Sequence, residues 1–413
     1  MSNVVEMNAP ARRKRRSSRT ALVLGGGGFT GGVYQIGALR ALDLLSSNRS
    51  VNQFDIYVGT SAGALIASLA ANGVSPEQMM RTVNDQVPYS LPPIQREMLL
   101  RFNKSEFALR ALKLPLHAVS MARNVASSLG SLSAVDLVLA LGDALPSGVY
   151  TGEGVEEYLR EALAAEGRTD DFRRLERELY LAATDLDTCE RIVLGAEGWD
   201  DIPISAAVRA STALPMIYAP YRVRDRELVD GGIVSTTNLD IAVEAGAKFI
   251  VVVNPLVPFV NDFSKTIPTL FGTRARRVSD MGFPKIGYQA FKLLAYQRLH
   301  EMASHWKERY PGVDIVLIEP DADDELMFQT NILNFASRVD VARHGFESVT
   351  LKLAQDYDDL REVCRRHGIE ISATRVRKVV RHFSAEREKT RAWRRILEQT
   401  TGALLRQSAD QGS

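Results

Sequence analysis

Ser61 lies at the centre of a short segment, Gly59-Thr-Ser-Ala-Gly63, in which it could act as a nucleophile. An expected strand at 54–58 precedes this segment, and the Ala- and Leu-rich stretch Ala62–Ala71, an expected helix, follows it. The pattern G-x-S-x-G between a strand and a helix is typical of a sharp turn that presents the serine hydroxyl for attack on a carbonyl carbon. The alternative is a turn of small residues in which Ser61 only caps the helix.

A run of glycines within residues 25–32 joins an expected strand at 21–24 to an expected helix at 31–45. The first amide groups of a helix are unpaired and lie at the positive end of its dipole. The segment can therefore hold an anion, either a bound phosphate or the oxyanion of an acyl transfer. Three of its glycines also fit the spacing G-x-G-x-x-G, so dinucleotide binding by the loop remains an alternative: Gly26, Gly28 and Gly31.

A nucleophilic serine requires a base, and the sequence offers two kinds of candidate. Asp230 follows an expected strand at 226–229 and precedes Gly231 and Gly232, so another side chain could approach its carboxylate closely. The same residues could form an ordinary Asp-Gly turn. None of the six histidines lies in a segment resembling a catalytic loop at a strand end, and His344 is the candidate for a conventional Ser–His–Asp triad.

Short apolar segments alternate with helical patterns, and these elements must position the three motifs. Further strands are expected at 179–183, Arg191–Leu194, Phe249–Val253 and Asp314–Ile318, and further helices at 154–164 and 241–244. The alternation predicts an α/β fold with a mostly parallel sheet. Residues 95–145 and 258–310 break the alternation and are expected to be helical insertions. In enzymes such insertions often shape a substrate pocket or lid, and the alternative is that they only add packing layers.

The composition excludes several other classes of protein. The chain has 413 residues, of which 45% are hydrophobic and 24% are charged, as in ordinary globular proteins. Two cysteines rule out a disulfide scaffold and a multi-thiolate zinc site. No apolar run reaches the roughly 18 residues of a membrane-spanning helix. The apolar segment after the first basic residues is too short for a secretory signal, so we expect a cytoplasmic protein.

The net charge of +1 conceals two basic ends. Residues 1–20 carry a net charge of +5 and residues 361–413 carry +7, which leaves −11 for the rest of the chain. We expect residues 1–20 to be a disordered basic arm, without a specific nucleic-acid partner. Residues 356–413 are expected to form a basic helical extension with an apolar stripe that includes Val376 and Trp393. That stripe could lie on an anionic membrane or dock on the rest of the protein.

Taken together and in this order, the glycine run, the G-x-S-x-G segment and the D-G-G segment resemble the motifs of the patatin-like phospholipase family. The stretches Ala183-Thr-Asp-Leu-Asp187 and Ala210-Ser-Thr-Ala-Leu-Pro215 add to this resemblance, which covers residues 20–355. It implies a three-layer α/β/α fold and hydrolysis of a lipid ester, namely a phospholipid, a lysophospholipid or an acylglycerol. It also implies that no metal or cofactor takes part.

The resemblance also assigns roles to individual residues of an expected catalytic domain at 21–355. Ser61 and Asp230 would form a catalytic dyad without a histidine. Three backbone amides would stabilise the oxyanion: those of Gly26, Gly27 and Gly28. The family loop usually reads G-G-G-x-R/K-G, and Thr30 stands where the basic residue is expected. This departure removes a cation from the loop and leaves its backbone amides in place.

Overall fold

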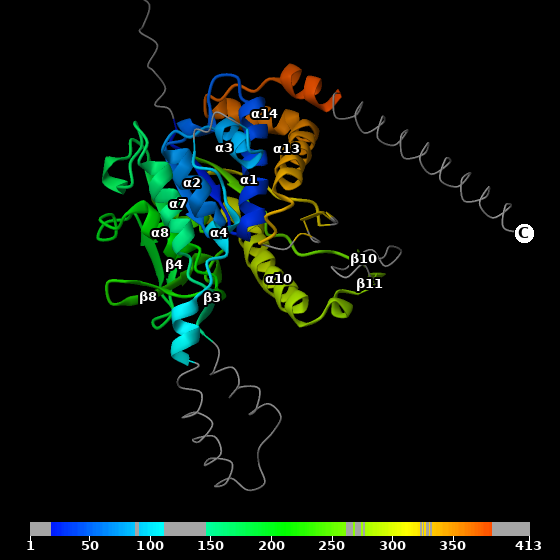
Figure 1. The fold of residues 1–413 in the computed structure, drawn as a ribbon. Coiled ribbons are helices and arrows are strands. Elements are labelled where there is room, and N and C mark those ends of the chain that lie inside the picture. Colours follow the sequence, from blue (N-terminus) through cyan, green and yellow to red (C-terminus); the bar gives the residue numbers. More distant parts are fainter. Residues whose placement is uncertain are drawn as a thin grey trace, which may run out of the picture.

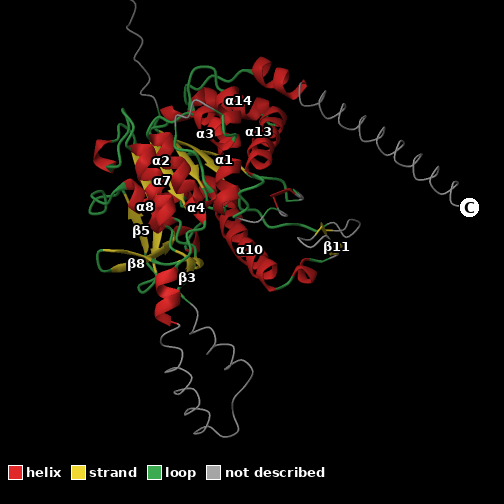
Figure 2. Cartoon of the chain, viewed as in Figure 1, coloured by secondary structure: helices red, strands yellow, loops and turns green. Residues whose placement is uncertain are grey.

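The computed structural model describes residues 18–86, 91–110, 146–261, 267–268, 274–275, 277–322, 324, 326–327, 330 and 333–381. The described chain forms a central sheet with helices packed on both of its faces (Figures 1 and 2). The predicted basic arm, apart from its last three residues, lies outside the described residues, as does the end of the predicted C-terminal extension. Within the described ranges, no helix is both long enough and apolar enough to cross a membrane.

Eight strands form the central sheet, in the order β12-β9-β1-β2-β4-β8-β7, with β5 also paired to β4. Strands β12, β9, β1, β2 and β4 run parallel, whereas β5 and β8 are antiparallel to β4, and β7 is antiparallel to β8. Their bounds are β1 (Thr20–Leu24), β2 (Ile56–Thr60), β4 (Glu178–Asp185), β5 (Arg191–Leu194), β7 (Tyr221–Val223), β8 (Arg226–Asp230), β9 (Phe249–Val253) and β12 (Asp314–Ile318). The prediction of an α/β fold with a mostly parallel sheet is confirmed.

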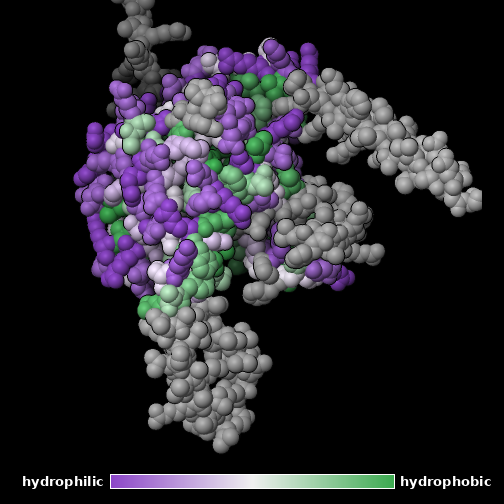
Figure 3. Space-filling view, in the orientation of Figure 1, coloured by the Kyte–Doolittle hydropathy of each residue, from purple (hydrophilic) through white to green (hydrophobic). Residues whose placement is uncertain are grey.

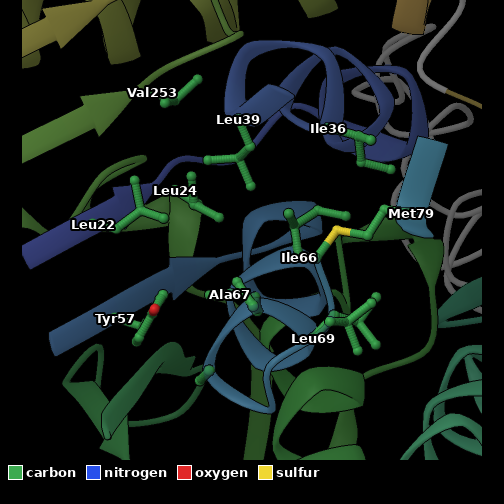
Figure 4. Packing of buried hydrophobic residues seen from close by; sticks show 14 of the residues in the cluster. Leu22, Leu24, Ile36, Leu39, Tyr57, Ile66, Ala67, Leu69, Met79 and Val253 are labelled. Atoms are coloured by element: carbon green, nitrogen blue, oxygen red, sulfur yellow. The ribbon is translucent and has the colours of Figure 1, made fainter. Parts of the chain in front are cut away.

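Alternate residues of the central strands face two separate hydrophobic clusters. In β1, Leu22 and Leu24 belong to one cluster, while Ala21 and Val23 belong to the other. Because side chains of a strand alternate between the two faces, a strand buried on both faces needs a continuous apolar run. Figure 4 shows the first cluster, in which residues of α1 and α2 pack against β1, β2 and β9. This double burial explains why the apolar runs located the central strands.

The helices divide between the two faces of the sheet. The first cluster includes residues of α1 (Gly28–Leu45), α2 (Ala62–Ala71), α3 (Pro76–Val83), α4 (Arg96–Leu99), α7 (Glu153–Leu163), α8 (Ile204–Ser211), α13 (Arg338–Gln355) and α14 (Tyr357–Arg366). The second includes residues of α9 (Leu239–Glu244), α10 (Phe283–Ser304) and α11 (Trp306–Arg309). The result is the three-layer α/β/α arrangement that the sequence resemblance implied.

Helices α1 and α13 cross closely because each has a glycine at the contact. A Cβ atom on Gly37 would lie 2.2 Å from the carbonyl oxygen of Ala342, and one on Gly345 would lie 2.5 Å from that of Tyr34. No side chain larger than hydrogen fits at these distances without moving the backbone. The crossing therefore fixes α1, whose first residue belongs to the glycine run.

The predicted bounds hold for several strands, but the strand expected at 54–58 is β2, which begins and ends two residues later in the chain. The ranges Arg191–Leu194, Phe249–Val253 and Asp314–Ile318 are strands with the predicted bounds. Helix α1 begins three residues earlier than predicted. The insertion expected at 258–310 contains α10 and α11 but also a small hairpin of β10 (Ile267–Pro268) and β11 (Arg274–Ala275), which the sequence did not predict. The strands β3 (Gly148–Tyr150) and β6 (Met216–Tyr218) were also not predicted, and within 95–145 residues 111–145 are not described.

The described part of the C-terminal extension docks on the body of the protein. Cys364 and Val376 are buried in the first hydrophobic cluster. The ring of His367 stacks on Phe249 with 4.9 Å between centroids, and its Nε2 lies 2.8 Å from a carboxylate oxygen of Asp314. Of the two alternatives for this extension, docking therefore holds up to residue 381.

Candidate active site

The register of the sheet brings the three motifs to the same end of neighbouring strands. Strand β1 ends level with β2, because Leu24 pairs with Gly59, and the glycine run and Ser61 follow these strand ends. Thr60 pairs with Ala182 of β4, and the next residue of β4, Ala183, pairs with Asp230. Asp230 therefore lies level with Ser61 on the other side of β4.

Ser61 occupies a strained turn between β2 and α2. Its φ is 56° and its ψ is −129°, a conformation that residues with a Cβ atom rarely adopt. The flanking glycines are sterically required, since a Cβ on Gly59 would lie 2.5 Å from the Cα of Ala64. A Cβ on Gly63 would lie 2.2 Å from the carbonyl oxygen of Leu24. The G-x-S-x-G segment thus forms the sharp turn that its pattern predicts.

Ser211 holds this turn in place, a role that sequence reasoning missed. The Ser61 amide donates to the Ser211 hydroxyl at 3.0 Å, and that hydroxyl donates to the carbonyl of Ala182 at 2.6 Å. The strained turn is thereby tied to β4 through a buried side chain. The stretch Ala210-Ser-Thr-Ala-Leu-Pro215 was the available signal, but nothing in its pattern gave Ser211 a function.

The glycine run lies directly against Ser61. A Cβ atom on Gly26 would lie 3.3 Å from the Cβ of Ser61 and 3.9 Å from its hydroxyl oxygen, and one on Gly27 would lie 2.8 Å from Pro255. The Gln35 side chain donates to the Gly25 carbonyl at 2.7 Å and holds the run from the α1 side. Glycine is therefore needed here for close approach to the serine.

The three amides predicted to hold an oxyanion differ in the structure. The Gly26 amide donates to the carbonyl of Thr236 at 2.9 Å, so it is already engaged. Gly27 is the N-cap of α1 and Gly28 is its first residue. Neither of their amides makes a backbone hydrogen bond within the described residues. Thr30, in the first turn of α1, is buried and carries no charge.

Asp230 is buried beside the serine and is only 2% exposed. Its Oδ1 accepts the Gly232 amide at 2.7 Å, and Asp230 lines the same cavity as Ser61. Burial raises the pKa of Asp230 from 3.8 to about 6, although interactions with Ser61 and with the Gly232 amide lower it. A carboxylate with this pKa is ionised at neutral pH and is more basic than an exposed aspartate. It can therefore accept a proton from the serine hydroxyl.

The described histidines have other partners. The Nε2 of His344 lies 2.5 Å from a carboxylate oxygen of Asp324, and that of His300 lies 2.9 Å from Glu319. The remaining two contact Ser304 and Asp314: His305 and His367. None of the four lines a cavity that contains Ser61. Two histidines lie outside the described residues: His117 and His382.

Two cavities meet at Ser61. The smaller one, of about 310 Å³, is lined by the glycine run and Asp230 and is bordered by Tyr288 and Phe291 of α10. The larger one, of about 870 Å³, is almost entirely apolar and extends between α1 and α2 toward Met79. The insertion at 258–310 thus contributes to the pocket, as expected, through α10.

A serine on a strained turn, a buried carboxylate in the same cavity and the first amides of a helix beside it make up the kind of site that serine hydrolases use for acyl transfer. The family profile described as patatin-like phospholipase matches residues 22–243, more than half of the chain. The protein belongs to the patatin-like phospholipase family. This membership decides against the dinucleotide-binding alternative for the glycine run.

Individual relatives are distant. "Probable lipid hydrolase 463L" of Invertebrate iridescent virus 6 is 20% identical over 230 residues, which span 54% of this chain and 63% of that protein. Among solved structures, VipD of Legionella pneumophila has 15% identity and a TM-score of 0.38, with 82% of this chain and 67% of that chain covered. The type III effector ExoU has 16% identity and a TM-score of 0.33, with 82% and 53% covered.

Proposed function

We propose that this protein hydrolyses carboxylic ester bonds of lipids, with Ser61 as the nucleophile and Asp230 as the base. The buried Asp230 carboxylate, which has a raised pKa and lines the same cavity as Ser61, is the observation that carries the proposal. The family supports the same class of substrate. The dyad needs no histidine, because Asp230 has a pKa of about 6 and is ionised at neutral pH.

The reaction proceeds in two steps. The Ser61 oxygen attacks the ester carbonyl carbon as Asp230 accepts the hydroxyl proton, and the carbonyl oxygen becomes an oxyanion. Collapse of this intermediate breaks the bond to the alcohol, which leaves with the proton from Asp230, and an acyl-Ser61 ester remains. Water then attacks the acyl carbon while Asp230 accepts its proton, and Ser61 is restored as the fatty acid departs.

We assign the oxyanion to the amides of Gly27 and Gly28. Both lie at the N-terminus of α1, where the helix dipole favours negative charge. One preorganised donor is typically worth about 3 kcal/mol in the transition state. The Gly26 amide joins them only if its bond to Thr236 is released. In either case Gly26 lets the loop approach Ser61 closely.

The two cavities separate the parts of the substrate. The apolar cavity beside Ser61 has the character of an acyl-chain site, because its lining offers little to a polar head group. The alcohol part of the ester then lies in the smaller cavity, against Tyr288 and Phe291. A long acyl ester of glycerol or of a phospholipid meets both requirements.

A fluorophosphonate probe and a panel of lipid esters test the proposal. The parent protein should be labelled at Ser61 and should release fatty acid from at least one lipid. Ser61→Ala should lose both activities, and Asp230→Asn should lose at least 100-fold in rate, as expected for removal of a general base. His344→Ala is the matched control and should keep full activity. Loss of activity in His344→Ala with activity retained in Asp230→Asn would establish the conventional triad instead.

The basic ends support a second, separate proposal, namely contact with an anionic membrane. Arg377, Lys378 and Arg381 are exposed on the docked part of the extension. Each basic residue near an anionic surface contributes about 1 kcal/mol to binding. Reversing these three charges should weaken co-sedimentation with vesicles containing phosphatidylserine and leave unfolding unchanged. Equal co-sedimentation of the parent and the triple variant would refute membrane contact at this surface.

A further inference from the structure

A second apolar cavity lies at the opposite end of α1 from the active site. It has a volume of about 590 Å³ and is bordered by Leu42 and Leu45 near the C-terminus of α1. The glycine run lies at the other end of the same helix. No residue that lines this cavity also lines either cavity at Ser61. We call it the distal cavity.

The walls of the distal cavity are apolar on several sides. The sheet contributes Phe249 and Val316, α13 contributes Leu353, and α14 contributes Leu360. The docked extension closes it with Ile371, whose backbone bridges to Ser46. The lining would make favourable dispersion contacts with an apolar ligand.

The polar lining residues are concentrated on one short segment, residues 46–53. In that segment the Ser46 hydroxyl accepts the Arg49 amide at 3.2 Å, and the Gln53 side chain accepts the Ser50 amide at 3.0 Å. The Ser50 hydroxyl accepts the Asn52 amide. These side chains are therefore engaged by the segment's own backbone. The cavity thus has one polar end and an apolar remainder.

Arg49 differs from the other polar residues at this end. Within the described chain, its guanidinium group has neither an ion pair nor a side-chain hydrogen bond, although it is half-buried at the cavity. A second cation, Arg375, donates to the Ser46 carbonyl at 3.0 Å from the docked extension. The nearby acid Asp43 accepts the Val51 amide at 2.7 Å. A guanidinium group in this position is free to bind an anionic group.

We propose that the distal cavity binds a free fatty acid, with its alkyl chain in the apolar part and its carboxylate on Arg49. Among the described residues that line it, one apolar compartment and one cation without an ion pair or side-chain hydrogen bond, Arg49, match one alkyl chain and one anionic group. Sugars and nucleotides require polar walls that this lining does not provide. The inference goes beyond the proposed hydrolysis and does not depend on it, since binding requires neither Ser61 nor Asp230.

Photo-crosslinking locates the fatty acid without any substitution. The full chain is mixed with a long-chain fatty acid that carries a diazirine near its methyl end, is irradiated, and is then mapped by peptide mass spectrometry. We expect cross-links on peptides that contain Leu353, Leu360 or Ile371. Cross-links confined to peptides that line the Ser61 cavity, such as those of α2 and α3, would overturn the proposal.

Calorimetry then tests the role of the carboxylate. The titrations use dodecanoate and dodecan-1-ol, which differ in the anionic group, on protein whose Ser61 is blocked by a long-chain fluorophosphonate. Arg49→Ala should weaken dodecanoate binding about tenfold, as expected for one charge-assisted hydrogen bond, and should leave dodecan-1-ol binding unchanged. The control Arg222→Ala removes an exposed arginine from β7, at the other edge of the sheet, and should change neither affinity.

A second variant tests the apolar part of the site. Leu360→Trp adds volume at the cavity wall and should weaken both ligands, with its melting temperature measured to verify folding. Equal binding of dodecanoate by the parent and by Arg49→Ala refutes the proposal, as does an absence of binding to the parent. If the fluorophosphonate fails to label Ser61, the proposed hydrolysis is in doubt, while the cross-link map still decides whether the distal cavity binds the fatty acid.

Discussion

Replacing Asp230 with Asn should make the folded protein more stable while abolishing its activity. The raised pKa of Asp230 means that the folded state disfavours the ionised carboxylate. The pKa is 3.8 in an exposed aspartate and about 6 in the folded protein, and this difference corresponds to about 3 kcal/mol of destabilisation at pH 7. Asn keeps the shape, can accept the Gly232 amide and carries no charge. Asp230→Asn should therefore gain up to about 3 kcal/mol in free energy of unfolding at pH 7.

The gain in unfolding free energy of Asp230→Asn should depend on pH. Above pH 6 the parent must bury a charge, so the advantage of the Asn variant is fully present. As the pH falls from 6 to about 4, Asp230 of the folded parent takes up a proton and the advantage declines. Below pH 4 the carboxyl group is neutral in both folded and unfolded chains, and the two proteins should have the same stability.

Urea unfolding followed by circular dichroism at pH 7, 5.5 and 4 measures the effect. Asp185→Asn is the control, because desolvation tends to raise the pKa of Asp185 but hydrogen bonds from the Asp187 amide and Arg226 outweigh it and lower the pKa. That variant should lose stability at pH 7 and at pH 5.5, and the loss should begin to shrink only near pH 4, where the carboxyl group of the unfolded chain takes up a proton. The reasoning fails if Asp230→Asn is no more stable than the parent at pH 7, or if its gain persists unchanged at pH 4.

Four further outcomes are expected. The rate of Ser61 labelling by a fluorophosphonate should fall about tenfold from pH 7 to pH 5, following ionisation of a group with a pKa of about 6; a rate constant independent of pH would exclude Asp230 as the base. Ser211→Ala leaves the Ser61 amide without its acceptor and should cost about 1–3 kcal/mol in unfolding free energy, with a fall in kcat that Ser211→Thr partly restores. Met79→Trp narrows the apolar cavity and should shift the preference from decanoate toward butyrate esters, as measured by the ratio of kcat/KM values. Met216→Glu places a charge at a side chain that is 81% exposed, and should slow hydrolysis of vesicle lipids while leaving a soluble butyrate ester unaffected.

The prediction for Met216 follows from the distribution of hydrophobic residues on the surface. Figure 3 shows a largely hydrophilic face with hydrophobic residues gathered around α4 and the residues that follow it. Phe102 is 44% exposed and its backbone bridges to Tyr150 in β3, which pairs with β6, the strand of Met216. Met98 and Leu99 of α4 also line the apolar cavity beside Ser61. A lipid bilayer that contacts this surface would therefore lie next to the acyl-chain site.

The sequence revealed the elements that local patterns determine. Phe249–Val253 was predicted with the observed bounds because a continuous apolar run of this length is typical of a strand that is buried on both faces. Helix α1 begins earlier than predicted. Glycine is a weak helix former, so Gly28 gave no helical signal in the sequence. In the structure, packing of Gly31 against Pro255 helps to fix the first turn. The short strands β3 and β6 have three residues each, too few for a periodic pattern.

The pairing of Ser61 with Asp230 could not be predicted from spacing alone. It depends on the register of two strand pairs, β2 with β4 and β4 with β8, which join distant parts of the chain. The resemblance to a family supplied the pairing, and the structure places both residues in the lining of one cavity. Register also determines which hydroxyl supports the turn, so Ser211 became recognisable only when its bond to the Ser61 amide was known.

The two motifs at the ends of β1 and β2 depend on each other, and one substitution tests this dependence. A Cβ atom on Gly63 would lie 2.2 Å from the Leu24 carbonyl oxygen and 2.6 Å from that of Gly25. Because these are backbone atoms, Gly63→Ala must push the glycine run away from the turn that holds Ser61. The predicted result is a loss of oxyanion stabilisation, and hence a fall in kcat of at least tenfold, even though alanine is a better helix former than glycine.

Gly287→Ala is the matched control, since a Cβ atom at that position in α10 meets nothing within 4 Å. It should keep its kcat and gain a few tenths of a kcal/mol or more in stability. If Gly63→Ala turned over substrate as fast as Gly287→Ala, the glycine run could move without any loss of activity. Its amides would then not be the oxyanion donors. A lowered kcat in Gly63→Ala alone would show that α2 and α1 must keep one fixed separation for Ser61 and the Gly27 and Gly28 amides to act on the same carbonyl group.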